Sequence, residues 1–259
     1  MDLFNFSPQN FLSFLLTLFR ISIILFFMPF FGAGGLPARI KAAITLVLSL
    51  ALWPYLHFPA SYFPAHPFGI AVMILGEALL GLTLGLIIHF LFAAIQTGGE
   101  LIGFQIGFAM INVLDPVTGT SESVTAHFLY MVGILTFLNL NGHLFLLKGL
   151  AESFKLVPPG GLFFSPGLVK NMLAFSSQIF VLAIKIASPV ILALFLIDLA
   201  LALISRAAPQ MNVLFVGFPL KIIVGFLFLG LLFEIMAIYI QGFISNLGLY
   251  FTTILKGLH

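Results

Sequence analysis

Long apolar runs, broken by proline, glycine and isolated charges, dominate the pattern of this 259-residue chain. Apolar and polar residues do not alternate along these runs, so the runs predict helices rather than the strands of a membrane barrel. The breaks predict about six long, partly kinked helices, of which the last two form a hairpin. The expected helices cover residues 8–28, 42–53, 68–96, 121–147, 171–205 and 211–246. A loop is expected at 148–170, where proline and glycine cluster.

The last two runs are longer than a membrane span requires. They contain 35 and 36 residues, whereas about 20 helical residues cross the apolar part of a bilayer. Pro189 and Pro219 are expected to kink them, and the turn at 206–210 joins them. A simple pair of spans does not account for this hairpin.

Composition places the chain in the membrane. Hydrophobic residues make up 61 % of it and charged residues 7 %, and the mean hydropathy is +1.23. So few charged side chains could not cover the surface of a soluble protein of this length. The apolar stretch 11–31 follows Asp2 and precedes no small-residue cleavage site; we expect it to be retained as a helix. The net charge of +2 does not indicate a nucleic-acid partner, and the absence of cysteine excludes disulfides and thiolate sites.

One segment, 97–120, combines features found nowhere else in the chain. Gly99, Gly103 and Gly107 recur at every fourth residue, which on a helix allows close approach of a second helix or provides a hinge. Beyond them an apolar stretch ends in Asp115-Pro116 and Gly119, a combination typical of turns. We expect a loop that packs against protein, and one that closes a pore is credible because non-helical backbone at membrane depth needs such surroundings.

Single charges interrupt the apolar runs, and a charge that faces lipid is costly. These residues are Arg20, Glu77, Lys185, Asp198, Lys221 and Glu234. They either pair at helix or subunit contacts or form an ion relay. Their wide spacing favours pairing, because relays concentrate their ionisable groups.

Sequence signatures of catalysis are missing. No phosphate loop, nucleotide fingerprint, zinc-protease pair or serine elbow occurs. The histidines, which include His57, His66, His89, His127 and His143, lack the spacing of metal ligands. We therefore expect no enzyme, no metal and no cofactor.

Several stretches, taken in order, resemble one protein family. They are Pro37-x-Arg39-x-Lys41, Gly76-Glu77 with Gly81 and Gly85, 96–108, Asp115-Pro116, Asn141-Gly142-His143 and 206–219. Each is weak alone, but their order and their spread over nearly the whole chain are specific. The chain resembles the FliR/SpaR/SctT family of type III secretion export-gate proteins, and the likeness to the flagellar branch is the stronger.

This resemblance implies a single-copy subunit of the flagellar export gate. Its partners would be several copies each of FliP and FliQ, together with FlhB and FlhA, in the inner membrane at the flagellar basal body. Unfolded flagellar proteins would pass through the gate. Residues 1–170 would form a FliP-like part with a plug-like loop at 104–119, and 171–259 a FliQ-like hairpin. The helices would then pack in a helical hetero-oligomer rather than as a simple bilayer bundle.

The residues expected to act fall into three groups. The plug would use Phe104, Phe108, Met110, Ile111, Val113, Leu114, Asp115 and Pro116, since an apolar constriction dewets and blocks ions. Hinges or close packing would use Gly99, Gly103, Gly107 and Gly119. Subunit contacts would use Glu77, Glu100, Lys185, Asp198, Arg206, Gln210, Asn212, Lys221 and Glu234.

Three rival hypotheses remain open at this point. One is a gate subunit of the virulence branch. Another is a secondary transporter of a small solute with Glu77, Lys185 and Asp198 as its relay. The third is a scaffold in which the loop only packs.

Overall fold

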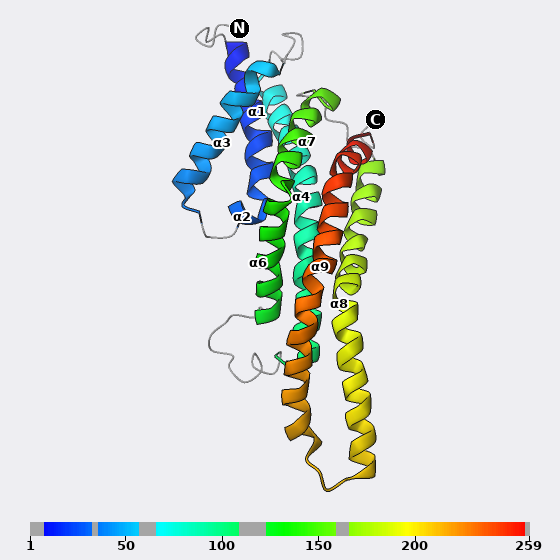
Figure 1. Cartoon of the computed structure of the whole chain (residues 1–259). Helices are drawn as coiled ribbons and strands as arrows, with labels where there is room; N and C mark the ends of the chain where they lie inside the picture. Colours follow the sequence, from blue (N-terminus) through cyan, green and yellow to red (C-terminus); the bar gives the residue numbers. More distant parts are fainter. Residues whose placement is uncertain (1–7, 33–35, 57–65, 109–122, 159–165, 257–259) are drawn as a thin grey trace. The chain divides into compact units, whose positions relative to one another are not determined.

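The structure is a computed structural model that describes residues 8–32, 36–56, 66–108, 123–158 and 166–256, and within these ranges it contains helices and no strand (Figure 1). The elements are α1 (Pro8–Phe26), α2 (Pro29–Gly32), α3 (Ala38–Leu52), the 3-10 turn η1 (Trp53–Tyr55), α4 (Pro67–Ile106), α6 (Val124–Asn139), α7 (Gly142–Leu156), α8 (Pro166–Ala207) and α9 (Val213–Lys256). By length and apolar composition, four stretches of the described chain are able to span a membrane, and a fifth if the bent pair α6 and α7 counts as one. The chain is an all-α membrane protein.

Three predicted boundaries were wrong. α4 does not stop near residue 96 but continues to Ile106. The first residues of the expected loop, Phe104 among them, are therefore helical. The expected helix at 121–147 is two helices, because Asn141 adopts a left-handed conformation with φ of 56° and ends the first of them. Most of the expected loop at 148–170 is helical, since α7 extends to Leu156 and α8 begins at Pro166.

The terminal helices are longer than predicted, at 42 residues for α8 and 44 for α9. Pro166 opens α8 at a position where its missing N–H is no loss. Pro189 lies inside the helix and cannot donate to the carbonyl of Lys185. The Ser188 hydroxyl donates to that carbonyl instead, at 3.1 Å, which keeps the helix continuous.

The chain divides into two compact units. Unit 1 contains Met1–Phe90, Asn141–Ser176 and Ile244–His259, and unit 2 contains Leu91–Leu140 and Ser177–Phe243. α4, α8 and α9 each contribute one part to each unit.

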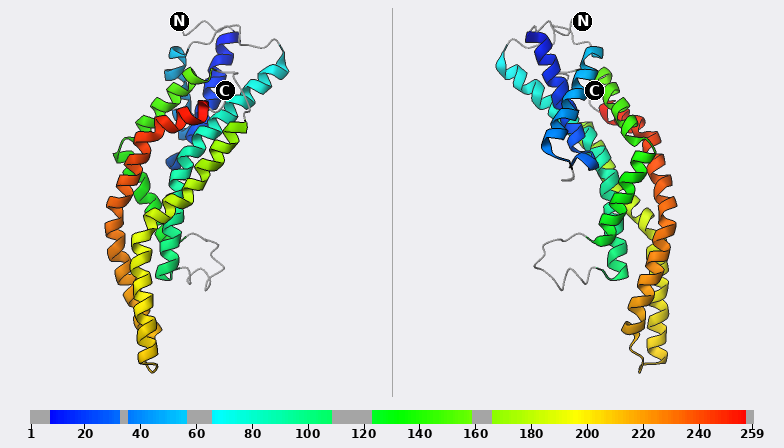
Figure 2. Two further views of the ribbon diagram at one scale, coloured as in Figure 1. Left: turned by 90° about the vertical axis from the view of Figure 1, so that its right-hand side faces the viewer. Right: turned by 60° about the vertical axis from the view of Figure 1, so that its left-hand side comes forward.

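Unit 1 is built on the contact between α1 and the first part of α4. Gly81 lies against Ile23, and Gly85 against the ring of Phe27, so closely that a Cβ at either glycine would collide. On its other side, α1 packs beside α3 (Figure 2). Glycine at these two positions therefore sets the distance between α1 and α4.

Unit 2 combines the last turns of α4 with α6 and with the hairpin of α8 and α9, whose arms lie side by side (Figures 1 and 2). Gly98 approaches the backbone of Ala183 on α8, and Gly133 on α6 faces Ile95 and Met236. The 18-residue apolar window of α4 is 61 % buried, whereas those of α8 and α9 are 28 % and 22 % buried. Within this chain, most residues in those two windows of the hairpin are therefore not buried.

Candidate functional site

The candidate site begins at the carboxyl end of α4, where the helix is closed by a specific cap. The Phe108 N–H donates to the carbonyl of Gly103 at 2.9 Å, and the Gly107 N–H to that of Phe104 at 3.1 Å. This pair of bonds is a Schellman motif, in which the residue directly after the C-cap needs a positive φ. Gly107 supplies it with φ of 104°. Gly107 therefore marks where the helix ends and the following segment begins.

The two earlier glycines of the same stripe lie against the start of α6. A Cβ at Gly99 would meet the backbone of Ala126 at 2.5 Å, and one at Gly103 would overlap the hydroxyls of Ser123 and Thr125. The Thr125 hydroxyl donates to the carbonyl of Gly99 at 3.0 Å. In this geometry both glycines permit close helix packing.

A polar cluster joins three helices of unit 2 near the same end of α4. The Gln105 amide donates to Asp198 Oδ2 at 3.0 Å, and Lys221 Nζ lies 2.5 Å from Asp198 Oδ1. Asp198 is 39 % exposed and Lys221 22 %. Both carboxylate oxygens of Asp198 are therefore engaged, and the cluster ties α4 to α8 and α9.

A small pocket of about 300 Å³ lies beside this cluster. Its walls include Phe104, Gly107 and Phe218 next to the Asp198–Lys221 pair. Phe104 is 72 % exposed, and the ring of Phe108 lies 6.3 Å from that of Phe226. The described part of the expected plug thus offers one exposed ring and one that packs on α9.

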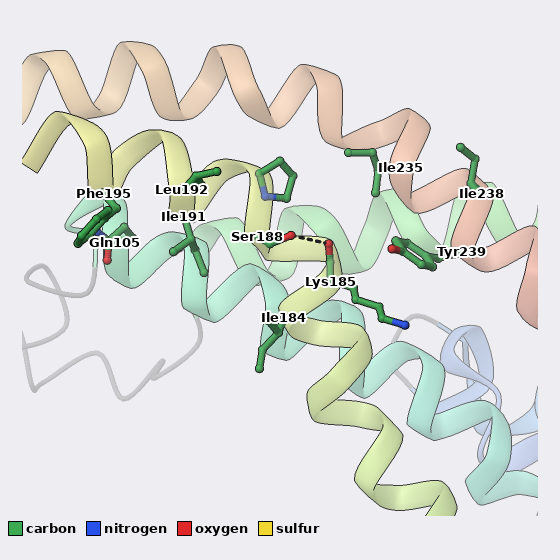
Figure 3. A pocket seen from close by; sticks show the side chains of 11 residues that line it. Gln105, Ile184, Lys185, Ser188, Ile191, Leu192, Phe195, Ile235, Ile238 and Tyr239 are labelled. Atoms are coloured by element: carbon green, nitrogen blue, oxygen red, sulfur yellow. Dashed lines mark hydrogen bonds between the residues drawn. The ribbon is translucent and has the colours of Figure 1, made fainter.

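A larger pocket of about 800 Å³ opens between α8 and α9 (Figure 3). Apolar side chains form most of it: Ile184, Ile191, Leu192, Phe195, Ile235 and Ile238. Lys185, Ser188 and Tyr239 add polar groups near one another, and Gln105 lies beside Phe195, away from them (Figure 3).

Unit 1 contains a separate buried ion pair. Arg20 Nε lies 2.5 Å from Glu77 Oε2, and Arg20 Nη2 donates to Glu77 Oε1 at 3.0 Å; the two residues are 0 % and 1 % exposed. Nη2 also donates to the carbonyl of Val157 at 3.1 Å, and Nη1 to the Ser153 hydroxyl at 3.4 Å. The guanidinium carbon lies 4.1 Å from the ring centre of Phe154. This pair joins α1, α4 and the end of α7.

The remaining predicted residues are placed as follows. Glu100, Lys185 and Glu234 are exposed, and so are Arg206, Gln210 and Asn212 at the tip of the hairpin. The structure brings Asp198 and Lys221 together but leaves Glu77 in unit 1, with Arg20 as its partner. Outside the described residues lie Met110, Ile111, Val113, Leu114, Asp115, Pro116 and Gly119.

Some residues of the site carried little signal in the sequence. Gln105 lies within the motif 96–108 and is not among the predicted site residues, although a lone amide between apolar residues indicates a polar partner. Ser123 and Thr125 follow the expected loop and gave no indication that they meet Gly103. In the described ranges, no three histidine, aspartate or glutamate residues gather as a metal site would require.

Comparison with known proteins covers almost the whole chain. The sequence profile of the family described as bacterial export proteins, family 1, matches residues 11–247. The flagellar biosynthetic protein FliR of Bacillus subtilis is 34 % identical over 236 residues, which are 90 % of each chain. FliR of Aquifex aeolicus is 35 % identical over 227 residues, 86 % of each chain. The surface presentation of antigens protein SpaR of Salmonella typhimurium is 31 % identical over 202 residues, 78 % of this chain and 75 % of SpaR.

Proposed function

This chain belongs to the bacterial export proteins of family 1, and we propose that it is a subunit of the flagellar type III protein export gate. It is a multi-pass protein of the inner membrane. In the proposed assembly it is present once, among several copies of FliP and FliQ and beside FlhB and FlhA. The cargo is unfolded flagellar protein. The flagellar branch is supported by relatives named FliR that cover more of the chain than SpaR does.

We assign to the two parts of the chain the roles that the resemblance implies. Residues 1–170 form the FliP-like part and 171–259 the FliQ-like hairpin. The low burial of the apolar windows of α8 and α9 supports a role for the hairpin in assembly. Helices of 42 and 44 residues exceed a bilayer span by more than twofold, so neighbouring subunits, not lipid alone, cover them.

The segment 104–119 acts as the plug. Phe104 and Phe108 stand at its start, where the Gly107 cap ends α4 and leaves Phe104 exposed. Apolar side chains further along, Met110, Ile111, Val113 and Leu114, fill the closed channel. They block ions by dewetting and do not bind a passing chain tightly. In sequence, Asp115-Pro116 is typical of a turn, and Gly119 offers the backbone freedom that a displacement of the plug by cargo would require.

Subunit contacts are made by charged and polar groups on the exposed surface. The tip residues Arg206, Gln210 and Asn212 face the neighbouring subunits, as do Glu100, Lys185 and Glu234. Glu77, Asp198 and Lys221 hold the chain's own helices in place for those contacts, because their partners lie within the chain. Neither catalysis nor a cofactor enters this account.

The observation that carries the proposal is the family match over residues 11–247. It is tested by deleting the gene in its own bacterium and measuring filament protein in the culture medium. We expect export to stop while filament protein remains present in the cytoplasm, and a plasmid copy of the gene should restore export. Undiminished export without the gene would overturn the proposal. Normal motility with loss of another secreted protein would favour the virulence branch.

Neither a solute transporter nor a pure scaffold is favoured by a specific observation. For a transporter, the relay would need free carboxylates, but Arg20 engages both oxygens of Glu77, and Gln105 and Lys221 those of Asp198. A pure scaffold predicts that changes in the segment 104–119 never alter the ion permeability of the membrane.

A further inference from the structure

Two charges in the middle of the hairpin helices, one on each helix, have no partner in the described part of the chain. Lys185 on α8 and Glu234 on α9 are both exposed, and neither has an oppositely charged atom within 4.0 Å. By contrast, Asp198 and Lys221, further along the same hairpin, neutralise each other. A lone charge in the middle of an apolar helix is costly to expose to lipid, so both charges require a polar partner.

Lys185 is part of a regular exposed seam on α8. Lys185, Ser188, Leu192, Phe195 and Leu199 follow one another at intervals of three and four residues, and all five are exposed. This spacing places them on one side of the helix, in the pattern that packs against another helix.

A matching seam runs along α9. Leu227, Leu231, Glu234 and Ile238 follow at intervals of four, three and four residues, and the three apolar members are between 58 % and 62 % exposed. Glu234 occupies a seam position just as Lys185 does on α8. Each seam is therefore apolar with one embedded charge, and the two charges have opposite sign.

The pocket of about 800 Å³ lies between the two helices at this level. It is lined by Lys185, Ser188, Leu192 and Phe195 of the α8 seam and by Ile238 of the α9 seam (Figure 3). Glu234 is one helical turn before Ile238 and on the same side of α9. The pocket thus follows the α8 seam and meets the α9 seam at Ile238, one helical turn from Glu234.

We propose that this pocket binds an apolar helix of another export-gate subunit, which presents a carboxylate to Lys185 and a basic side chain to Glu234. This inference rests on the proposed function, because it requires assembly with other membrane subunits. The helix lies between α8 and α9, its apolar side chains fill the pocket, and its two charges satisfy Lys185 and Glu234. Two opposite charges, one on each helix of the hairpin, fix the depth at which the helix binds.

The charge pattern favours a protein helix over a lipid. An anionic headgroup would satisfy Lys185, but it would repel Glu234 and leave that carboxylate without a cation. Acyl chains would fill the apolar pocket and satisfy neither charge. A helix that carries both signs of charge would fill the apolar lining and also satisfy Lys185 and the neighbouring Glu234.

The first test is photocrosslinking in the complete complex, co-expressed with the neighbouring export genes. A photoreactive amino acid replaces Leu192 in the seam or, as a matched control, exposed Ile204 of the same helix. We expect Leu192 to crosslink to one apolar helix that carries an acidic and a basic residue, and Ile204 not to crosslink to that helix. Crosslinks from Leu192 to phospholipid alone, or to a helix without both charges, would overturn the proposal.

The second test reverses the charges. Lys185→Glu should lower the yield of purified complex by about tenfold or more, because a like charge then faces the partner's carboxylate. Lys185→Arg should retain the yield, and so should Lys170→Glu, which alters an exposed lysine elsewhere on α8. Reversing the crosslinked helix's acid to lysine should restore the yield of Lys185→Glu.

The double variant Lys185→Glu/Glu234→Lys distinguishes pairing with a partner helix from pairing of the two residues with each other. If the two residues neutralised each other, the swap would restore assembly, and the proposal would be wrong. We expect it to assemble as poorly as the single reversals. Failure of this proposal is distinct from failure of the proposed function: in the first case the unaltered chain still purifies with other subunits, and in the second it does not.

Discussion

Arg20 joins three helices of unit 1 through one side chain. Its guanidinium engages both oxygens of Glu77 and reaches the Ser153 hydroxyl and the carbonyl of Val157, the residue that caps α7. A planar, forked cation suits this set of acceptors, and a lysine ammonium does not. The cost of taking both charges out of water is offset only while the whole network is intact.

Breaking this pair is therefore expected to destabilise the chain strongly. Glu77→Gln leaves a buried guanidinium without its counter-charge and should cost about 3–5 kcal/mol. Arg20→Lys should also be destabilising, because one ammonium cannot replace the forked contacts. Thermal unfolding of the purified chain in mild detergent measures both. Exposed Arg39 provides the control: if Arg39→Gln is as harmful as Glu77→Gln, the network has no special role.

Gly107 is expected to be irreplaceable for a backbone reason. With φ of 104°, Gly107→Ala should cost about 1–2 kcal/mol from conformation alone, and its Cβ would meet the Phe218 ring at 3.0 Å. Gly230→Ala on α9 is the control, because nothing lies within 4 Å of a Cβ there and helix propensity then favours alanine. Gly107→Ala should lower the melting temperature and Gly230→Ala should raise it. A higher melting temperature for Gly107→Ala would contradict the capping role of Gly107.

The sequence was a better guide to the individual charged residues that need a partner than to the identity of those partners. A charge inside an apolar run must be neutralised, so Arg20 and Asp198 could be selected without coordinates. Their partners are far away in the chain: Arg20 meets Glu77, and Asp198 meets Gln105. Spacing along a helix cannot reveal such pairs, because they form only when distant helices pack.

At the scale of the element, helix ends were the weak point of the prediction. The expected helix ended near residue 96, yet α4 continues to Ile106, and Gly99 and Gly103 in its last turns lie against the start of α6. Conversely, Asn141 breaks the expected fourth helix through a left-handed conformation that asparagine tolerates. Tertiary contact decided the first case and local backbone chemistry the second.

Pro189 inside α8 leads to a prediction about the stability of that helix. Ser188→Ala should cost about 1 kcal/mol, because the carbonyl of Lys185 then loses the donor that replaces the missing N–H of Pro189. In a Pro189→Ala background the backbone N–H is present, and the same serine change should be nearly neutral. A double-mutant cycle on the melting temperature of the isolated chain measures this coupling; strictly additive losses would refute it.

At the scale of the whole molecule, the exposed hairpin has a structural consequence. Residues 171–246 were recognised as too long for two plain spans, and α8 and α9 proved longer still. Length and exposure support the proposal that other subunits surround the hairpin, but they do not identify those subunits. The partners follow from the family and not from the physics of one chain, because the complementary surfaces belong to other proteins.

The plug gives a prediction for the assembled complex. Deleting 108–114 removes the apolar side chains of Phe108, Ile111 and their neighbours, so the closed gate should conduct small ions. Conductance of the purified complex in planar bilayers is expected to rise well above that of the unaltered complex. Replacing the segment by an equally long glycine–serine stretch controls for loop length and should leak as well. Unchanged conductance in both variants would exclude the plug and favour the scaffold.

The central claim, membership of a hetero-oligomeric export gate, is tested most directly by native mass spectrometry. The tagged chain is purified in mild detergent after co-expression with its neighbouring genes, and the mass of the intact particle is measured. We expect one copy of this chain together with several copies of small helical partners. A stable monomer or homodimer that contains none of these partners would contradict the claim.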